Sequence, residues 1–229
     1  MMKVVEIFNS IDGEGSRAGF LATFIRLYGC NLACTYCDSN YACMGNDYKE
    51  MTIYEILTEV DKYNCHNITL TGGEPLIHQD VKKLISLLIK NGYQVNIETN
   101  GSKEIESIRN YIKYKYGLTA ARNNLFFTMD WKSIYSGMAA KNLRNNLMEL
   151  DENDVIKFVV ADDKDLEQMT DIITTYLPYL TCHIFVSPVF GKIEPKDIVA
   201  YLQKNQCLSN VRLQLQMHKY IWPADMRGV

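Results

Sequence analysis

The sequence lacks any apolar run long enough to span a bilayer, and Met1 to Phe8 has one lysine and no apolar core of the signal-peptide type. We therefore expect no membrane association and a cytoplasmic location. A large excess of positive or negative charge is also lacking, because 24 basic and 27 acidic side chains leave a net charge of −3. Without a strong positive field, no direct nucleic-acid partner is indicated, and a small-molecule substrate fits the composition better.

Internal repeats, low-complexity linkers and breaks in composition are absent as well, so nothing marks a second domain. Hydrophobic residues make up 47% of the chain and charged residues 22%, which is enough apolar material for a core and excludes a disordered chain. The length of 229 residues matches one α/β barrel. We predict that residues 1–229 form a single domain.

Apolar, β-branched runs alternate with helical patterns along most of the chain. Thr52 followed by Glu55 forms a capping box, which predicts a helix that ends near Tyr63. Strands are predicted at residues 4–8, 23–28, 67–71, 94–99, 125–129, 155–161, 183–187 and 211–215. Because repeated strand–helix–strand units form parallel sheets, we predict an α/β fold built as a partial or complete barrel, and favour it over an open doubly wound sheet.

Polar motifs follow four of the predicted strands. They are Cys30 and its neighbours, the segment from Gly72 to Pro75, the segment from Glu98 to Gly101, and Gln216 to His218. Ligands of parallel α/β folds bind beyond the carboxyl ends of the strands, where the loops converge. The four motifs therefore predict one shared site.

Cysteine is distributed unevenly, because three of the seven cysteines, Cys30, Cys34 and Cys37, lie within eight residues. An odd, clustered set does not match a disulfide framework and indicates metal ligands. A structural zinc site needs a fourth ligand, for which Cys43 could serve, and a four-cysteine iron–sulfur carrier could use Cys43 or Cys65. Three thiolates on a four-iron cluster would instead leave one iron open to chelate an amino and a carboxylate group.

The Cys-x-x-x-Cys-x-x-Cys spacing, with Tyr36 before its last cysteine, resembles the signature of the radical S-adenosylmethionine superfamily. Gly72-Gly73-Glu74-Pro75 resembles the superfamily's second motif, whose backbone contacts the amino end of the cofactor. The resemblance implies a 4Fe–4S cluster ligated by Cys30, Cys34 and Cys37, and S-adenosylmethionine as the second cofactor. It also implies cofactor contacts from Tyr36, Cys37, Asp38, Gly72, Gly73 and Glu74.

Stretches outside these motifs resemble one branch of that superfamily, the 7-carboxy-7-deazaguanine synthases. The similar segments are Ser10 to Gly15, Phe24 to Cys30, Cys37 to Ser39, Gln216 to Lys219, and Trp222 to Val229. They span both ends of the chain, so this resemblance is more specific than the cysteine motif. Asp12 departs from the pattern by standing where the family commonly has glutamine, and Asp130-Trp131-Lys132 stands where some relatives have Ser-Pro-Lys.

This resemblance implies conversion of 6-carboxy-5,6,7,8-tetrahydropterin to 7-carboxy-7-deazaguanine with loss of ammonia, a step of queuosine and other 7-deazapurine pathways. A 5′-deoxyadenosyl radical would remove hydrogen from carbon 6 of the pterin, and Mg²⁺ would fix the geometry of the ring contraction. The implied partners are a flavodoxin or ferredoxin as electron donor and a second copy of the chain in a homodimer.

The resemblance also implies roles for individual residues. Arg26 pairs with the substrate carboxylate, which suits its rigid, permanently charged fork, although a surface charge at a strand end is the plainer interpretation of an arginine there. Ser39 offers a hydroxyl to Mg²⁺. The other implied substrate contacts are Ile11, Asp12, Gly13, Glu14, Thr71, Glu98, His218 and Val229, and the remaining cofactor contacts are Asp130, Trp131 and Lys132.

Two other functions stay open at this point. A glycyl-radical enzyme activase shares the cysteine motif and acts on a protein partner, but Arg26, Ser39 and the Gln216 to Lys219 segment argue against it. A non-catalytic iron–sulfur or zinc binding module needs only the cysteines.

Overall fold

Nine strands form one sheet in the computed structural model, which describes residues 1–224 and 226–229. Their order across the sheet is β3-β1-β2-β4-β5-β6-β7-β8-β9, and its two outer strands do not pair with each other. The sheet is therefore a partial barrel, and the complete barrel does not form in this part of the chain. The strands are β1 (Met2–Ile11), β2 (Leu21–Leu27), β3 (Lys49–Met51), β4 (Asn67–Gly72), β5 (Gln94–Thr99), β6 (Leu125–Trp131), β7 (Val155–Val160), β8 (His183–Pro188) and β9 (Val211–Leu213).

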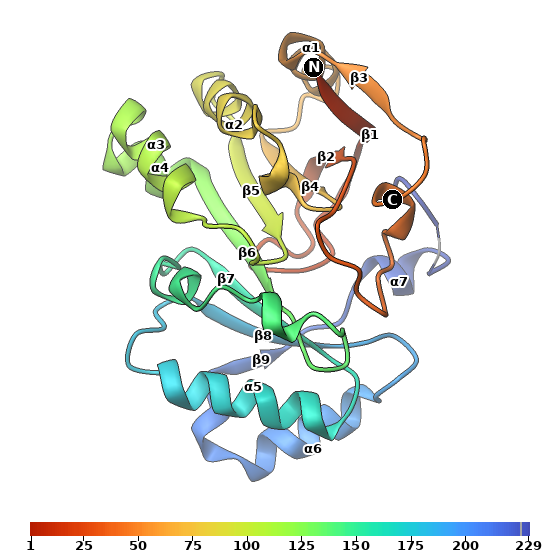
Figure 1. The fold of residues 1–229 in the computed structure, drawn as a ribbon, viewed down its shortest axis with the longest axis vertical. Helices are drawn as coiled ribbons and strands as arrows, with labels where there is room; N and C mark the ends of the chain where they lie inside the picture. The colour runs from red at the N-terminus through yellow and green to blue at the C-terminus, as the bar shows by residue number, and fades with distance from the viewer. Residues whose placement is uncertain (225) are drawn as a thin grey trace.

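The strands from β2 to β9 in this order are parallel, as predicted, because helices or long crossovers connect them. Strand β1 is antiparallel to β2, because only a short loop over residues 12–20 joins the two strands, and it is also antiparallel to β3. The helices are α1 (Ile53–Asp61), α2 (Val81–Lys90), α3 (Glu106–Tyr116), α4 (Leu118–Asn124), α5 (Asp163–Tyr176), α6 (Pro195–Lys204) and α7 (His218–Ile221). Figure 1 shows α2 to α4 beside β5 and β6, and α5 and α6 beside β7 to β9.

All eight predicted strands are present, and only β3 was missed. Its three residues are half-buried or exposed, so they carry no apolar run for a sequence pattern to detect. Thr52 and Glu55 form both hydrogen bonds of the predicted capping box, at 3.2 Å and 2.7 Å, and α1 ends at Asp61. No helix in the described part of the chain is long and apolar enough to cross a membrane.

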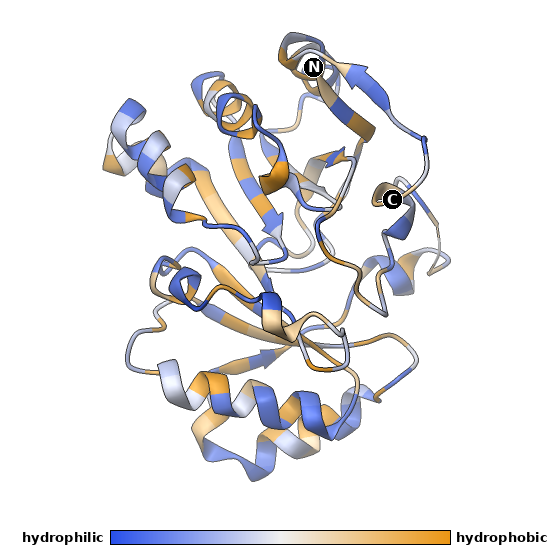
Figure 2. Ribbon diagram, in the orientation of Figure 1, coloured by the Kyte–Doolittle hydropathy of each residue, from blue (hydrophilic) through white to orange (hydrophobic). Residues whose placement is uncertain are grey.

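The core lies between the sheet and the helices that cover its outer face (Figure 2). Leu84 and Leu88 of α2 are fully buried there, and each such side chain contributes about 1.5–3 kcal/mol by leaving water. Side chains alternate along a strand, so Phe127, Met129 and Trp131 of β6 belong to this core. Their neighbour Asp130 faces the inside of the partial barrel and lines a cavity there. The outer face is thus apolar, and the inner face is free to carry polar groups.

Candidate active site

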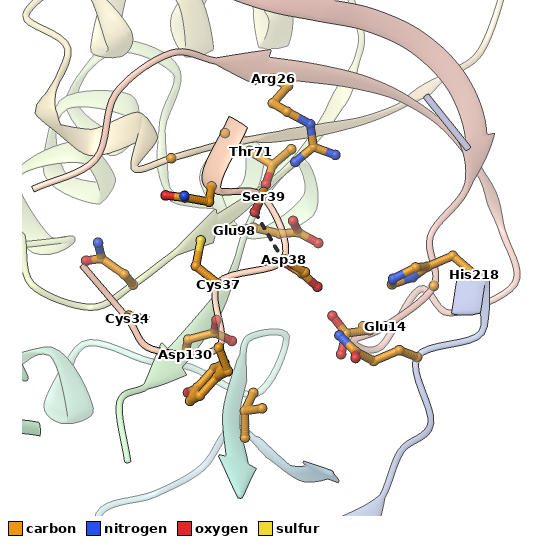
Figure 3. Close-up of a pocket in the computed structure, with 18 of the residues that line it drawn as sticks. Glu14, Arg26, Cys34, Cys37, Asp38, Ser39, Thr71, Glu98, Asp130 and His218 are labelled. Carbon is orange, nitrogen blue, oxygen red and sulfur yellow. Dashed lines mark hydrogen bonds between the residues drawn. The ribbon is translucent and has the colours of Figure 1, made fainter. Parts of the chain in front are cut away.

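A cavity of about 480 Å³ lies inside the partial barrel, at the carboxyl ends of the parallel strands (Figure 3). Its lining includes residues from all four of the polar motifs predicted to share one site. The predicted site residues that line it are Ile11, Gly13, Glu14, Arg26, Cys30, Cys34, Tyr36, Cys37, Asp38, Ser39, Thr71, Gly72, Gly73, Glu98, Asp130, Lys132, His218 and Val229.

Three predicted site residues do not line the cavity. Trp131 is 4% exposed and packs into the core on the opposite face of β6. Asp12 is buried at the start of the loop over residues 12–20, the N-terminal loop, where it pairs with Arg17 at 3.0 Å. Glu74 is fully buried behind the cavity wall. The structure therefore gives these three side chains contacts within the protein, and Asp225 of the predicted C-terminal segment lies outside the described residues.

The cysteine loop forms one wall of the cavity, with Cys30, Cys34 and Cys37 partly buried. Thr35 anchors the outer side of the loop, because its hydroxyl donates to the Tyr135 carbonyl at 2.7 Å. Short turns rather than a helix or strand carry residues 29–39. The three sulfurs therefore face one cavity from a loop that is fixed at both ends, by β2 and by the short helix η1 (Asn40–Ala42).

Local donors favour the thiolate form of two of these cysteines. A hydrogen bond with Cys43 lowers the pKa of Cys30 to about 6, against the opposing effect of burial, and the same contact lowers the pKa of Cys37 to about 7. Leu32 N and Asn100 Nδ2 also donate to Cys30 Sγ, at 3.4 Å and 3.6 Å. Thiolates are the form of cysteine that ligates metal.

The two cysteines considered as a fourth ligand lie in different places. Cys43 lines the cavity and contacts both Cys30 and Cys37. Cys65 lies before the amino end of β4, where its thiol donates to the Leu21 carbonyl at 3.4 Å. Cys43 was considered as a ligand from the sequence, but its contact with Cys30 and Cys37 was not predicted. That contact forms because the short helix η1 brings the chain back to the cysteine loop.

The glycine motif brings the end of β4 against the cysteine loop. A Cβ on Gly73 would lie 2.2 Å from the Gly29 carbonyl oxygen, so only glycine fits at this close approach. Behind it, Glu74 accepts from Thr99 Oγ1 at 2.9 Å and from Asn100 N at 2.6 Å. Glu74 thus joins the ends of β4 and β5, and burial raises its pKa to about 7.

The opposite wall combines the two ends of the chain. Glu14 and His218 lie there, across the cavity from Cys34 and Cys37 (Figure 3). Gly13 leaves room for the imidazole, because a Cβ on it would lie 2.7 Å from His218 Nδ1 and the His218 side chain would have to shift. The side-chain amide of Gln214 accepts from Gly15 N at 2.7 Å and donates to Gly15 O at 3.0 Å. The N-terminal loop and the C-terminal segment therefore form one continuous surface.

Arg26 is held at the cavity by residues that the sequence did not single out. Its Nε donates to Glu6 Oε1 at 2.7 Å, and the Tyr41 hydroxyl donates to the same oxygen at 2.8 Å. Glu6 and Arg26 are register partners in the β1–β2 pair. The terminal nitrogens of Arg26 make no hydrogen bond to the described residues, so they are free to bind a carboxylate that enters the cavity.

A charged floor completes the site. Lys157 Nζ lies 2.8 Å from Glu14 Oε2 and 3.0 Å from Asp130 Oδ1, and Lys132 Nζ lies 3.0 Å from Asp130 Oδ2. Burial alone would raise the pKa of Asp130, but the two ammonium groups lower it to about 2. For Glu98 the balance is the opposite. Burial raises its pKa to about 7, and the nearby Lys157 ammonium offsets this only in part.

Comparisons with known proteins decide the family. Residues 24–122 match the model of the radical SAM superfamily. A curated 7-carboxy-7-deazaguanine synthase from Clostridium acetobutylicum is 43% identical over 229 residues, which cover 99% of both chains. A second, from Methanospirillum hungatei JF-1, is 35% identical and aligns over 96% of this chain and 85% of its own. The chain belongs to the 7-carboxy-7-deazaguanine synthase family.

Solved structures confirm the fold of this 7-carboxy-7-deazaguanine synthase family member. The crystal structure of QueE from Escherichia coli matches it with a TM-score of 0.72 at 24% identity, covering 95% of this chain and 94% of that one. Streptococcus suis SuiB bound to S-adenosylmethionine matches with a TM-score of 0.55 at 12% identity, over 82% of this chain and 48% of its own. The predicted partial barrel of the radical SAM type is thus confirmed.

Members of this family use a 4Fe–4S cluster and S-adenosylmethionine as cofactors, as predicted for this chain. The family also argues against the two alternative functions, the glycyl-radical enzyme activase and the non-catalytic binding module. The residues present fit both groups. Three cysteines face one cavity, two of them with pKa values lowered toward the thiolate form, and Gly73 keeps the wall beside Cys30 free of a side chain. The remaining cavity is lined by cations and carboxylates, which suits charged ligands.

Proposed function

We propose that this enzyme converts 6-carboxy-5,6,7,8-tetrahydropterin to 7-carboxy-7-deazaguanine and ammonia, within a single domain formed by residues 1–229. The observation that supports this most strongly is the pairing, in one cavity, of a three-cysteine wall with an arginine whose terminal nitrogens are free. The 43% identity to a curated synthase supports the same reaction. The product would serve queuosine or another 7-deazapurine.

In this proposal Cys30, Cys34 and Cys37 ligate the cluster, and the glycine motif lies along the methionine part of S-adenosylmethionine. When bound, the reduced cluster and S-adenosylmethionine supply the radical that starts the reaction. Asp130 and Lys132, held together at 3.0 Å, would contact the same cofactor with Tyr36 and Asp38. The protein contributes orientation and exclusion of water around reactive species.

The substrate would bind across the cavity from the cysteines. Arg26 pairs with its carboxylate, oriented by Glu6. Glu14 and Glu98 accept hydrogen bonds from the N–H groups of the pterin ring, and His218 donates to an oxygen. Backbone groups of Ile11 and Gly13, together with Thr71 and the C-terminal Val229, would complete the enclosure, since all of them line the cavity.

Ser39 is the proposed protein ligand of Mg²⁺. Its hydroxyl faces Asp38 at 3.3 Å, and Asp38 in turn pairs with Lys219 at 3.2 Å. Magnesium keeps several waters and takes substrate oxygens rather than a full set of protein ligands. The Ser39 hydroxyl would supply one ligand, and water and the substrate's oxygens would supply the others.

The electron donor in this proposal is a flavodoxin or ferredoxin, and the enzyme acts as a homodimer in the cytoplasm. The cysteine pattern supports a reducing compartment, because an odd set of seven with three clustered in eight residues does not match a disulfide framework.

The experiment that tests this function is anaerobic reconstitution with iron and sulfide, followed by incubation with the carboxytetrahydropterin, S-adenosylmethionine, dithionite and Mg²⁺. We expect 7-carboxy-7-deazaguanine and ammonia in equal amounts, and a large loss of rate when Mg²⁺ is omitted. Protein with a full cluster that forms no deazaguanine would refute the substrate assignment. Full rate without Mg²⁺ would refute only the proposed role of Ser39 as a magnesium ligand and would leave the proposed reaction standing.

The raised pKa of Glu98 predicts how activity depends on pH. Only the ionised carboxylate accepts hydrogen bonds at both oxygens, and burial keeps Glu98 protonated until the pH approaches about 7. We expect kcat/KM for the pterin to rise about tenfold per pH unit below this value and to level off above it. Burial lowers the pKa of His218, which lines the same cavity, so its titration lies further to the acid side.

The matched control for this pH profile is Glu98→Gln. It keeps the size of the side chain and removes the titration, so its kcat/KM should be lower and nearly flat through the same interval. Glu74 has a pKa near 7 as well but does not line the cavity, and it is unchanged in this variant. An acid limb that survives Glu98→Gln would assign the titration to another group.

A further inference from the structure

Lys157 is a charged residue in an apolar strand. Its five neighbours in β7 are valine, isoleucine and phenylalanine, and every residue of the strand is buried. The lysine itself is 7% exposed. Removing an ammonium group from water is costly unless charged partners replace the water, so a buried lysine needs fixed anions around it.

Those anions come from two separate parts of the site. Glu14 lies on the N-terminal loop, which forms the wall opposite the cysteines, and Asp130 lies at the end of β6. Lys157 contacts both and therefore joins the wall proposed for the substrate to the strand proposed for the cofactor. Asp130 is already paired with Lys132 at 3.0 Å, whereas Glu14 has no other cation within ion-pair distance among the described residues.

The two oxygens of Glu14 differ in their surroundings. Oε2 accepts from Lys157 at 2.8 Å. Oε1 is buried and finds no hydrogen-bond donor in the described part of the chain. An unpaired buried acceptor is unfavourable by itself, and at the wall of a ligand cavity it marks the place where a ligand donor fits.

We propose that Lys157 is a positioning residue, which binds Glu14 Oε2 and thereby presents Glu14 Oε1 as an unpaired acceptor for an N–H group of the substrate's aminopyrimidinone ring. The inference rests on the proposed function, because that function supplies a ring with N–H donors. Asp130 holds the ammonium group from the other side, so the carboxylate of Glu14 is fixed before the ligand arrives. This preorganisation lowers the cost of binding.

The test compares Lys157→Met with Lys157→Arg. Methionine is an unbranched apolar side chain that suits the buried strand, and arginine keeps the charge. The readout is the dissociation constant of the product, 7-carboxy-7-deazaguanine, on cluster-loaded protein without reductant, together with KM and kcat for the pterin. We expect Lys157→Met to raise the dissociation constant and KM by about tenfold or more with a smaller change in kcat, and Lys157→Arg to restore most of the affinity.

The double variant Lys157→Met/Asp130→Asn separates positioning from charge balance. If Lys157 only neutralises Asp130, removing both charges restores the product affinity. In our proposal the affinity for the product does not recover, because Glu14 still lacks its partner. The melting temperature recovers only in part in either case, because Asp130→Asn also leaves Lys132 without its carboxylate. Recovery of affinity, or an unchanged affinity in folded Lys157→Met, would overturn the proposal. Wild-type protein that binds the product but forms none overturns the proposed reaction and leaves the Lys157 comparison intact.

Discussion

Replacing Cys34 with alanine is expected to abolish both the visible absorbance of the iron–sulfur cluster and all turnover. Cys34 is one of three cysteines that face the cavity from a single loop, so its removal leaves a four-iron cluster with two protein ligands. A cluster that has lost a thiolate ligand is not retained in a form able to reduce S-adenosylmethionine. Absorbance after anaerobic reconstitution, iron content and product formation measure the effect.

Cys43→Ala is the matched control for this experiment. Cys43 lines the same cavity and contacts Cys30 and Cys37, but it lies outside the three-cysteine signature. We expect it to keep the cluster absorbance and most of the turnover. Loss of the cluster in Cys43→Ala, with retention in Cys34→Ala, would show that a different set of thiolates holds the metal and would contradict the assigned loop.

Replacing Arg26 with glutamine is expected to lower kcat/KM for the pterin by about a hundredfold or more. The guanidinium is the cation proposed to pair with the substrate carboxylate in a site that is largely removed from water, and leaving a charged partner unpaired there costs about 2–5 kcal/mol. Arg26→Lys should recover only part of this loss, because an ammonium group cannot form the two parallel hydrogen bonds of the guanidinium. Steady-state kinetics with varied pterin measures both effects.

Glu6→Gln provides the graded comparison. The guanidinium stays, but the ionic contact at Nε that orients it is weakened. We therefore expect a loss of about tenfold, between wild type and Arg26→Gln. Melting temperatures exclude unfolding as the cause, and KM for S-adenosylmethionine should stay constant in both variants. If Arg26→Gln changes that KM and not the KM for the pterin, Arg26 belongs to the cofactor side of the cavity.

The strands of the fold were predictable because each buries an apolar run whose period is visible locally. The strand β3 was not predictable, because a short edge strand pairs on one side only and needs no apolar pattern. The antiparallel direction of β1 was not predicted, and its reason is that the loop over residues 12–20 is too short to hold a crossover helix before β2. Trp131 shows why the alternation matters, because adjacent residues of a strand point to opposite faces. Asp130 reaches the cavity, whereas Trp131, which was predicted to contact the cofactor, packs into the core.

The active site likewise has some features that were predictable from the sequence and others that were not. Cysteine spacing and the strand-end motifs are local patterns, so the sequence indicated the cluster loop and the convergence of distant segments. Glu6, Tyr41 and Lys157 carry no such pattern. Each matters only through a partner far away in the chain, and a single glutamate, tyrosine or lysine in a sequence does not say which residue it will meet.

The sequence by itself determined the chemistry of this protein: three thiolates at a fixed spacing on one loop, and the succession of strands that brings the polar loops to one end of a parallel sheet. Only the tertiary structure decided which charges are paired. Strand register sets Glu6 against Arg26 and Asp130 against Lys157, and the folding of the N-terminal loop over the inside of the partial barrel brings Glu14 within hydrogen-bond distance of Lys157. Ionic contacts depend on distances of a few ångströms between remote residues, and such distances exist only once the core has packed.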